Sequence, residues 1–272
     1  MRESIPERRL DTTVRMRAVA GRPLGHAVQA ARKVPEVTIF FWIIKLLTTG
    51  MGETTSDYLV YHIDPYLAVA LGGIGLVVSL LLQLAVRRYI PWVYWLTVVM
   101  VAIFGTMAAD VVHIVLGVPY LISSIGFAVA LAAIFAGWYT SEKTLSIHSI
   151  TTRRRELFYW ATIMATFALG TAVGDMTAST LGLGYFASGL LFAVLFALPG
   201  LGYWLVGLNE VVAFWFAYIM TRPLGASFAD WFGKPHSVSG LGLGTGQISL
   251  VLAVLIAGFV GYVTVTRKDT PR

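Results

Sequence analysis

Charged side chains occur inside long apolar stretches of this sequence, and these residues are the ones that could do chemistry. If the stretches cross a bilayer, each charge near the centre costs about 2.5–3.5 kcal/mol, so it should have a partner, a bound ion or water. Carboxylates gathered there would bind a cation or relay protons. Alternatively, each aspartate caps or hydrogen-bonds a helix turn at the membrane surface. The charged residues are Lys45, Glu53, Asp57, Asp110, Asp175, Arg222 and Asp230.

Glu53 and Asp57 form the best supported acidic pair. They are four residues apart, which puts both carboxylates on one face of a helix. The two acids should repel each other unless a divalent cation, a shared proton, or Lys45 and Arg222 supply positive charge between them. Oxygen ligands without sulfur suit hard ions such as Mg²⁺, Mn²⁺ or Ca²⁺. If a metal is bound, we expect Glu53 and Asp57 to ligate it, and we expect no other cofactor.

Four of the aspartates end copies of one pattern: an aromatic residue, tryptophan, nine residues, glycine, four residues and aspartate. The copies cover residues 41–57, 94–110, 159–175 and 214–230 and align without a gap. Repeated units fold alike, so the four aspartates should occupy equivalent places and converge as a ring. The other pattern residues are Trp42, Trp95, Trp160 and Trp215, with Gly52, Gly105, Gly170 and Gly225.

Residues that differ between the copies could support a site. Lys45 and Arg222 each occur in one copy, and the first copy carries Thr49 at the arginine position. Both charges could instead neutralise an aspartate for stability. His113 follows Asp110 by three residues, so both could reach one metal, or His113 could be a histidine with a fixed tautomer at a helix end.

The aspartates would be positioned by helices. Fifteen residues separate tryptophan from aspartate in each copy, which is about 22 Å of helix, so tryptophan should lie toward the cytoplasmic interface and aspartate toward the other side. The intervening glycine suits close contact between membrane helices. We predict an all-α transmembrane bundle of eight helices, made of four tandem αα-hairpin repeats. The predicted divisions are a basic tail at 1–35, repeats at 36–88, 89–141, 142–207 (with a basic linker) and 208–266, and a tail at 267–272.

The composition indicates a membrane protein. Of the 272 residues, 57% are hydrophobic and 12% are charged, about half the charge of a soluble domain. The absence of cysteine excludes disulfides, thiolate metal sites and cysteine nucleophiles. Most lysines and arginines lie in the two tails and in alternate loops, so the net charge of +6 indicates membrane orientation and not nucleic-acid binding. By the positive-inside rule both termini are cytoplasmic.

The arrangement resembles a bacterial family of integral membrane proteins of unknown function, described as four tandem repeats of two transmembrane segments with a shared tryptophan. The resemblance covers residues about 36–266 and rests on the repeat number, the helix number and the four tryptophans. It implies a multi-pass protein of the bacterial inner membrane and supplies no activity.

These observations predict a small secondary transporter for a cation, either a divalent metal such as Mn²⁺ or Mg²⁺ or an ion coupled to protons. Its partners would be membrane lipid and the cation, and a homo-oligomer is compatible with the sequence. The alternative is a non-transporting scaffold or sensor whose basic N-terminal tail binds anionic lipid or a cytoplasmic partner. We do not expect an enzyme, because the sequence lacks His-Glu-x-x-His and Gly-x-Ser-x-Gly.

Overall fold

The structure, a computed structural model, describes residues 32–270. The predicted basic tail falls mainly on residues 1–31, which lie outside the described residues. The all-α fold with eight long helices is confirmed in the described part of the chain. The helices are α3 (Ile39–His62), α4 (Pro65–Ala85), α5 (Pro91–Asp110), α6 (Tyr120–Glu142), α7 (Arg153–Asp175), α8 (Gly184–Val206), α9 (Glu210–Gly233) and α10 (Thr245–Thr266).

Short helices lie in the connections. α5 and α7 each continue into a π-helical turn, at Val111–Val115 and Met176–Thr180, directly after the repeated aspartate. Two 3₁₀ turns, at Ile147–Ser149 and His236–Val238, precede α7 and α10. The repeated aspartates therefore lie where the first helix of each copy changes its winding or approaches its end.

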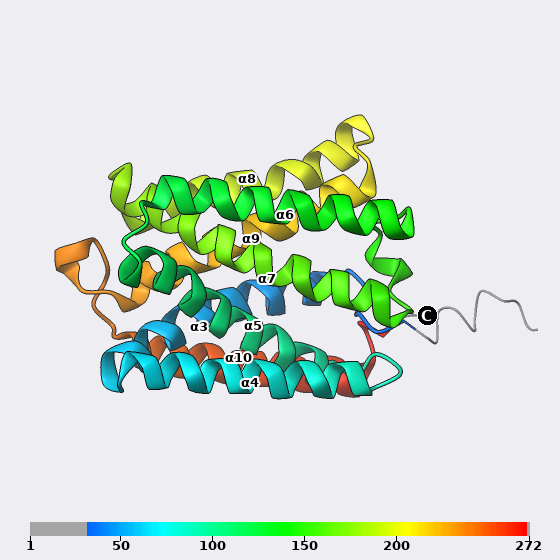
Figure 1. Cartoon of the computed structure of the whole chain (residues 1–272), viewed down its shortest axis with the longest axis horizontal. Coiled ribbons are helices and arrows are strands. Elements are labelled where there is room, and N and C mark those ends of the chain that lie inside the picture. The colour runs from blue at the N-terminus through cyan, green and yellow to red at the C-terminus, as the bar shows by residue number, and fades with distance from the viewer. Residues whose placement is uncertain (1–31, 271–272) are drawn as a thin grey trace, which may run out of the picture.

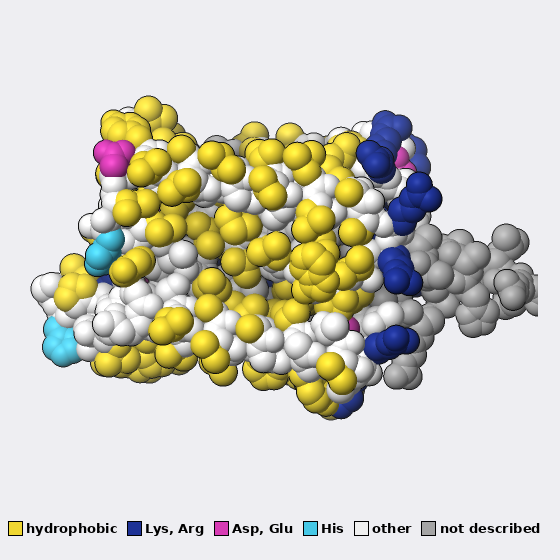
Figure 2. All heavy atoms as spheres, turned by 90° about the horizontal axis from the view of Figure 1, so that it is seen from below, with side chains coloured by type: hydrophobic (Ala, Val, Ile, Leu, Met, Phe, Trp, Pro, Cys, Tyr) yellow, Lys and Arg dark blue, Asp and Glu magenta, His cyan; other side chains and the backbone are white. Residues whose placement is uncertain are grey.

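Seven of the eight long helices in residues 32–270 are long and apolar enough to cross a bilayer. The exception is α3, which carries Lys45, Glu53 and Asp57 and is packed among α5, α9 and α10. Large apolar side chains such as Leu81 and Leu250 point outward, and Figure 2 shows a broad hydrophobic surface on the face that it displays. The chain is therefore a multi-pass membrane protein.

The first helices of the four copies form an inner ring. α3 packs on α5, α5 on α7, α7 on α9, and α9 returns to α3, so the ring closes within one chain. The second helices cover the ring from outside, with α6 and α8 along one side in Figure 1 and α4 and α10 along the other.

The second helix of each copy packs mainly on the first helix of the next copy, and only weakly on its own. α4 lies on α5, α6 on α7, α8 on α9, and α10 on α3. The four tandem helix pairs that the sequence predicted are present, and the two helices of each pair lie mainly against different neighbours. Neighbouring copies are therefore interlocked, and the contacts that hold them are van der Waals packing and hydrogen bonds, because lipid gives no hydrophobic drive to helix association.

The repeated glycines make the four inner contacts equivalent. A Cβ added to Gly52 would come 2.8 Å from the backbone carbonyl carbon of Ala102, a distance that real side chains do not adopt. Small residues allow membrane helices this close approach. In every copy the glycine faces the residue three positions before the glycine of the next copy: Gly52 faces Ala102, Gly105 faces Phe167, Gly170 faces Arg222, and Gly225 faces Thr49.

Both ends of the described chain lie at one end of the bundle. The backbone N–H of Glu36 donates to the carbonyl oxygen of Asp269 at 2.9 Å, and the hydroxyl of Tyr89 donates to the Asp269 carboxylate. Figure 2 shows lysine and arginine side chains gathered at this end. We call it the basic end, and the opposite end the acidic end.

The repeated tryptophans lie toward the basic end, as the spacing predicts, but inside the bundle and not in the lipid interface. Trp95, Trp160 and Trp215 are at most 5% exposed. Trp215, for example, is covered by Phe135 and Trp138 of α6, a second helix from another copy. Trp42 is only half-buried.

Candidate functional site

Residues four apart along the inner helices form layers across the ring axis, since positions i and i+4 share a helix face. Starting at the basic end, the aromatic layer is Phe41, Tyr94, Tyr159 and Phe214. Next come Lys45, Val98, Ile163 and Tyr218, and then Thr49, Ala102, Phe167 and Arg222. The last two layers are Glu53, Thr106, Thr171 and Ala226, and then Asp57, Asp110, Asp175 and Asp230. Every residue in these layers is buried except Asp57, Asp110 and Asp175, which are partly exposed.

The aromatic layer fills the axis at the basic end. The hydroxyls of Tyr94 and Tyr159 hydrogen-bond to each other, and the rings of Phe41 and Phe214 lie 6.0 Å apart. The four side chains are at most 9% exposed, so this layer is tightly packed.

Carboxylates from different copies meet at the acidic end. One carboxylate oxygen each from Glu53, Asp175 and Asp230 lies within 4.8 Å of the other two. Asp110 is close enough to Glu53, Asp175 and Asp57 to interact with them electrostatically. Asp230 is 2% exposed, and its Oδ1 has no hydrogen-bond partner in the described chain. We call these five residues the carboxylate cluster.

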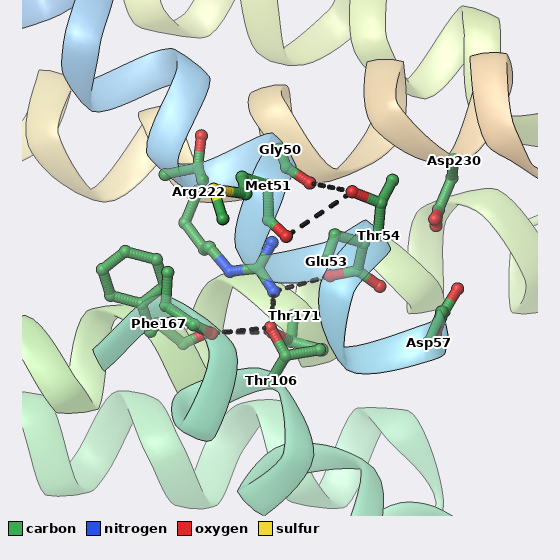
Figure 3. Close-up of polar contacts among 12 residues, drawn as sticks. Gly50, Met51, Glu53, Thr54, Asp57, Thr106, Phe167, Thr171, Arg222 and Asp230 are labelled. Atoms are coloured by element: carbon green, nitrogen blue, oxygen red, sulfur yellow. Dashed lines mark hydrogen bonds and ion pairs between the residues drawn. The ribbon is translucent and has the colours of Figure 1, made fainter. Parts of the chain in front are cut away.

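Arg222 links its own copy to the other three, on the side of the cluster that faces the basic end (Figure 3). Its Nη2 donates to Glu53 Oε2 at 2.6 Å, to Thr171 Oγ1 at 2.7 Å, and to the hydroxyl of Thr106. Both threonine hydroxyls donate to carbonyl oxygens of their own helices, which leaves their lone pairs to accept from the guanidinium. Arg222 therefore neutralises Glu53 inside the bundle.

Thr106 and Thr171 were missed by sequence reasoning, although the repeat alignment places them at the position of Glu53. The same alignment would have found them, because a polar residue recurs there in three of the four copies.

Lys45 does not reach the carboxylates. Its Nζ lies 4.0 Å from the ring centroid of Phe167 and 4.1 Å from that of Tyr218, with no hydrogen-bond acceptor in the described chain. These are cation–π contacts. Thr49 donates to the carbonyl oxygen of Leu46 at 2.7 Å and packs against Gly225, which is a structural role.

Lys234 is a second missed member of the site. It follows α9, and its Nζ lies 3.1 Å from Asp230 Oδ2 and 3.3 Å from Asp57 Oδ2. Burial by itself would lower the pKa of Lys234, but the neighbouring carboxylates, led by Asp230, raise the pKa well above its ordinary value. The signal in the sequence was its position four residues after Asp230, at a place where the other copies carry no cation.

The carboxylates that approach one another are not the pair that the sequence singled out. The sequence favoured Glu53 with Asp57, but the three carboxylates that approach one another are Glu53, Asp175 and Asp230, while Asp57 faces Lys234. The helical spacing alone could not show this, because the choice depends on which copies are opposite each other in the ring.

His113 lies outside the group of three carboxylates. Its Nδ1 donates to the carbonyl oxygen of Val118 at 2.7 Å, and its ring stacks on Tyr120 with 3.3 Å between centroids. The imidazole thus holds the connection between α5 and α6, which matches the structural alternative for this residue.

The site remains acidic after these contacts are counted. The cluster brings five carboxylates, and the cations of the inner bundle are Arg222, Lys234 and Lys45. Only Arg222 and Lys234 contact the carboxylates, so at least two formal negative charges are left even when the distant Lys45 is counted, and a divalent cation or protons would balance them. All donor atoms are oxygens, the ligand type that hard cations prefer.

Fold and site together define a class: a polytopic membrane protein made by fourfold repetition of a helix pair, with acids of every copy at one end of a closed ring. The chain belongs to the family described as Repeat of Unknown Function (DUF347), whose model matches residues 40–89, 93–144, 158–207 and 213–269. This confirms the resemblance drawn from the repeats. No curated protein and no solved structure matches the chain.

Proposed function

We propose that this protein is a small secondary transporter that carries a cation through the carboxylate cluster, without enzymatic activity. The observation that carries the proposal is the approach of Glu53, Asp175 and Asp230, from three different copies, to within 4.8 Å in a membrane-spanning bundle. Ionisable residues within membrane-spanning helices mark ion or proton pathways, because their insertion into lipid is costly.

The charge balance supports a cation that is divalent or exchanges with protons. At least two carboxylates lack a counter-charge, which a Mg²⁺ or Mn²⁺ ion, or protons, would supply. The filled aromatic layer favours a carrier over an open channel, because an ion that enters from the acidic end meets packed rings at the other end.

The basic end supports a cytoplasmic location of both termini in a bacterial inner membrane, since lysine and arginine are retained on the cytoplasmic side. The ring closes within one chain, so the proposed site needs no second copy, and a homo-oligomer would repeat it.

Purified protein in proteoliposomes would test the proposal. Uptake of Mn²⁺ and Mg²⁺, and the movement of protons, would be followed with fluorescent reporters under an imposed pH gradient. Asp175→Asn is the informative variant, because the Asp175 side chain makes no hydrogen bond or ion pair with a described residue and the fold should survive.

Asp64→Asn is the matched control. Asp64 caps α4 at the acidic end, where asparagine caps equally well, and it is not part of the cluster. We expect Asp64→Asn to transport like the parent and Asp175→Asn to lose cation flux. Equal flux in parent, Asp175→Asn and protein-free liposomes would defeat the proposal.

A further inference from the structure

A cavity of about 450 Å³ lies at the basic end, away from the carboxylate cluster. Its apolar walls are Trp42 of α3, Phe214 of α9, and Phe196 and Tyr203 of α8. The volume falls within the range of about 300–1,000 Å³ that small-molecule sites occupy. The C-terminal part of α8, beyond Pro199, rises away from the bundle in Figure 1.

The cavity exists because α8 packs on Trp42 less completely than α6 packs on Trp215. Trp215 is covered by α6, whose Phe135 and Trp138 lie 5.1 and 5.8 Å from its ring centroid. Repeat three follows repeat two by 65 residues, the interval between Trp95 and Trp160. The corresponding residues of α8 are therefore Gly200 and Tyr203.

These two residues leave part of Trp42 uncovered, although Phe196 of α8 packs edge-to-face on its ring with 5.4 Å between centroids. A Cβ added to Gly200 would meet no atom within 4 Å, and Tyr203 is 54% exposed, whereas Trp138 is fully buried. The space that Phe135 fills beside Trp215 is thus empty beside Trp42. A duplicated scaffold can acquire a separate site where one of several equivalent interfaces has diverged.

The mouth of the cavity is polar and carries two carboxylates. His148 lies between them, with Nδ1 3.6 Å from Glu36 and Nε2 3.5 Å from Glu210. Arg32 donates to Glu36 at 2.5 Å and so balances that charge. Glu210 has no arginine or lysine partner among the described residues, and its side chain is 69% exposed.

We propose that this cavity binds an organic cation, a substituted ammonium ion with an aromatic or alkyl body. The aromatic rings of Trp42, Phe196 and Phe214 in the lining suit a poorly hydrated cation, and Glu210 supplies the counter-charge. The unbalanced Glu210 carboxylate opposes a fatty acid or an anionic lipid headgroup in the mouth, and the aromatic walls offer no ligands to a hydrated metal ion. The site is independent of the carboxylate cluster, because Trp42 and Asp57 are about 22 Å apart along α3.

Binding of benzyltrimethylammonium to the purified full chain in detergent tests the proposal. Isothermal titration at pH 8, where free imidazole is neutral, gives the affinity. Neopentylbenzene, in which carbon replaces the nitrogen, is the neutral probe of the same shape. We expect the ammonium ion to bind and the neutral probe to bind at least about tenfold more weakly, equivalent to 1.4 kcal/mol.

Two variants separate the parts of the site. Gly200→Phe supplies the side chain that repeat two has at this position, and it should abolish binding while the protein stays folded. Glu210→Gln should weaken the binding of the ammonium ion and leave the binding of the neutral probe unchanged. The matched control is Gly126→Phe, since Gly126 is an exposed glycine of α6 with open space around it.

Three results would overturn the proposal. Equal binding of the charged and neutral probes would show an apolar cavity without preference for a cation. Unchanged binding by Gly200→Phe would place the probe elsewhere. A co-purified lipid, detected by mass spectrometry and not displaced by benzyltrimethylammonium, would show that lipid is the occupant. None of these results bears on transport through the carboxylate cluster.

Discussion

Replacement of Arg222 by methionine removes the cation that neutralises Glu53 inside the bundle. Methionine retains much of the apolar volume, so the main loss is the charge together with three hydrogen bonds from Nη2. Glu53 is 3% exposed and would be left as an uncompensated buried charge. Removal of one partner from such a pair costs about 3–5 kcal/mol.

The companion variant removes both charges. Glu53→Gln combined with Arg222→Met leaves no buried ion, and the glutamine amide can donate to the hydroxyl of Thr106 or Thr171. We expect this double variant to be more stable than Arg222→Met alone. The double-mutant cycle should give a coupling energy of about 2–3 kcal/mol between the two residues.

Reversible unfolding in mixed micelles, followed by far-ultraviolet circular dichroism, measures these free energies. Arg154→Met is the control, because the Arg154 side chain is 65% exposed and lies 3.5 Å from Glu142. Its cost should be about 0–1 kcal/mol. A cost for Arg222→Met no larger than that of the control, or a coupling energy near zero, would refute the inferred pairing of Arg222 with Glu53.

Three further predictions concern the ring and its ends. Gly52→Ala should destabilise the protein by about 1–3 kcal/mol in the same unfolding assay, because its Cβ meets the Ala102 backbone, whereas Gly126→Ala should not destabilise it. Lys234→Gln should lower the Kd of the transported cation at least about tenfold by removing a competing ammonium, with Lys268→Gln at the basic end as control. His113→Asn, which keeps a donor near the Val118 carbonyl, should leave cation flux in proteoliposomes unchanged, and a loss of flux would give His113 a role at the site.

Most of the fold could be predicted from the four repeats in the sequence. The constant spacing of tryptophan, glycine and aspartate placed each set at one height along the bundle, because helix rise per residue is constant. The apolar stretches showed that the solvent is lipid, and the glycines marked the close contacts. Glu53 and Arg222 could be identified as unusual, since a single charge in an apolar helix is costly wherever the helix packs.

The lateral order of the helices was decided only by the tertiary structure. Hydropathy and spacing are the same whether a second helix packs on its own copy or on the next one, so the interlocked ring could not be read from them. The pairing of Arg222 with Glu53, 169 residues apart, and of Lys234 with Asp57 follows from that order. The cavity beside Trp42 follows from it as well, because Gly200 leaves a space only where α8 is the helix that should cover the indole. Contacts between distant residues are chosen by the packing of whole helices, which no local pattern encodes.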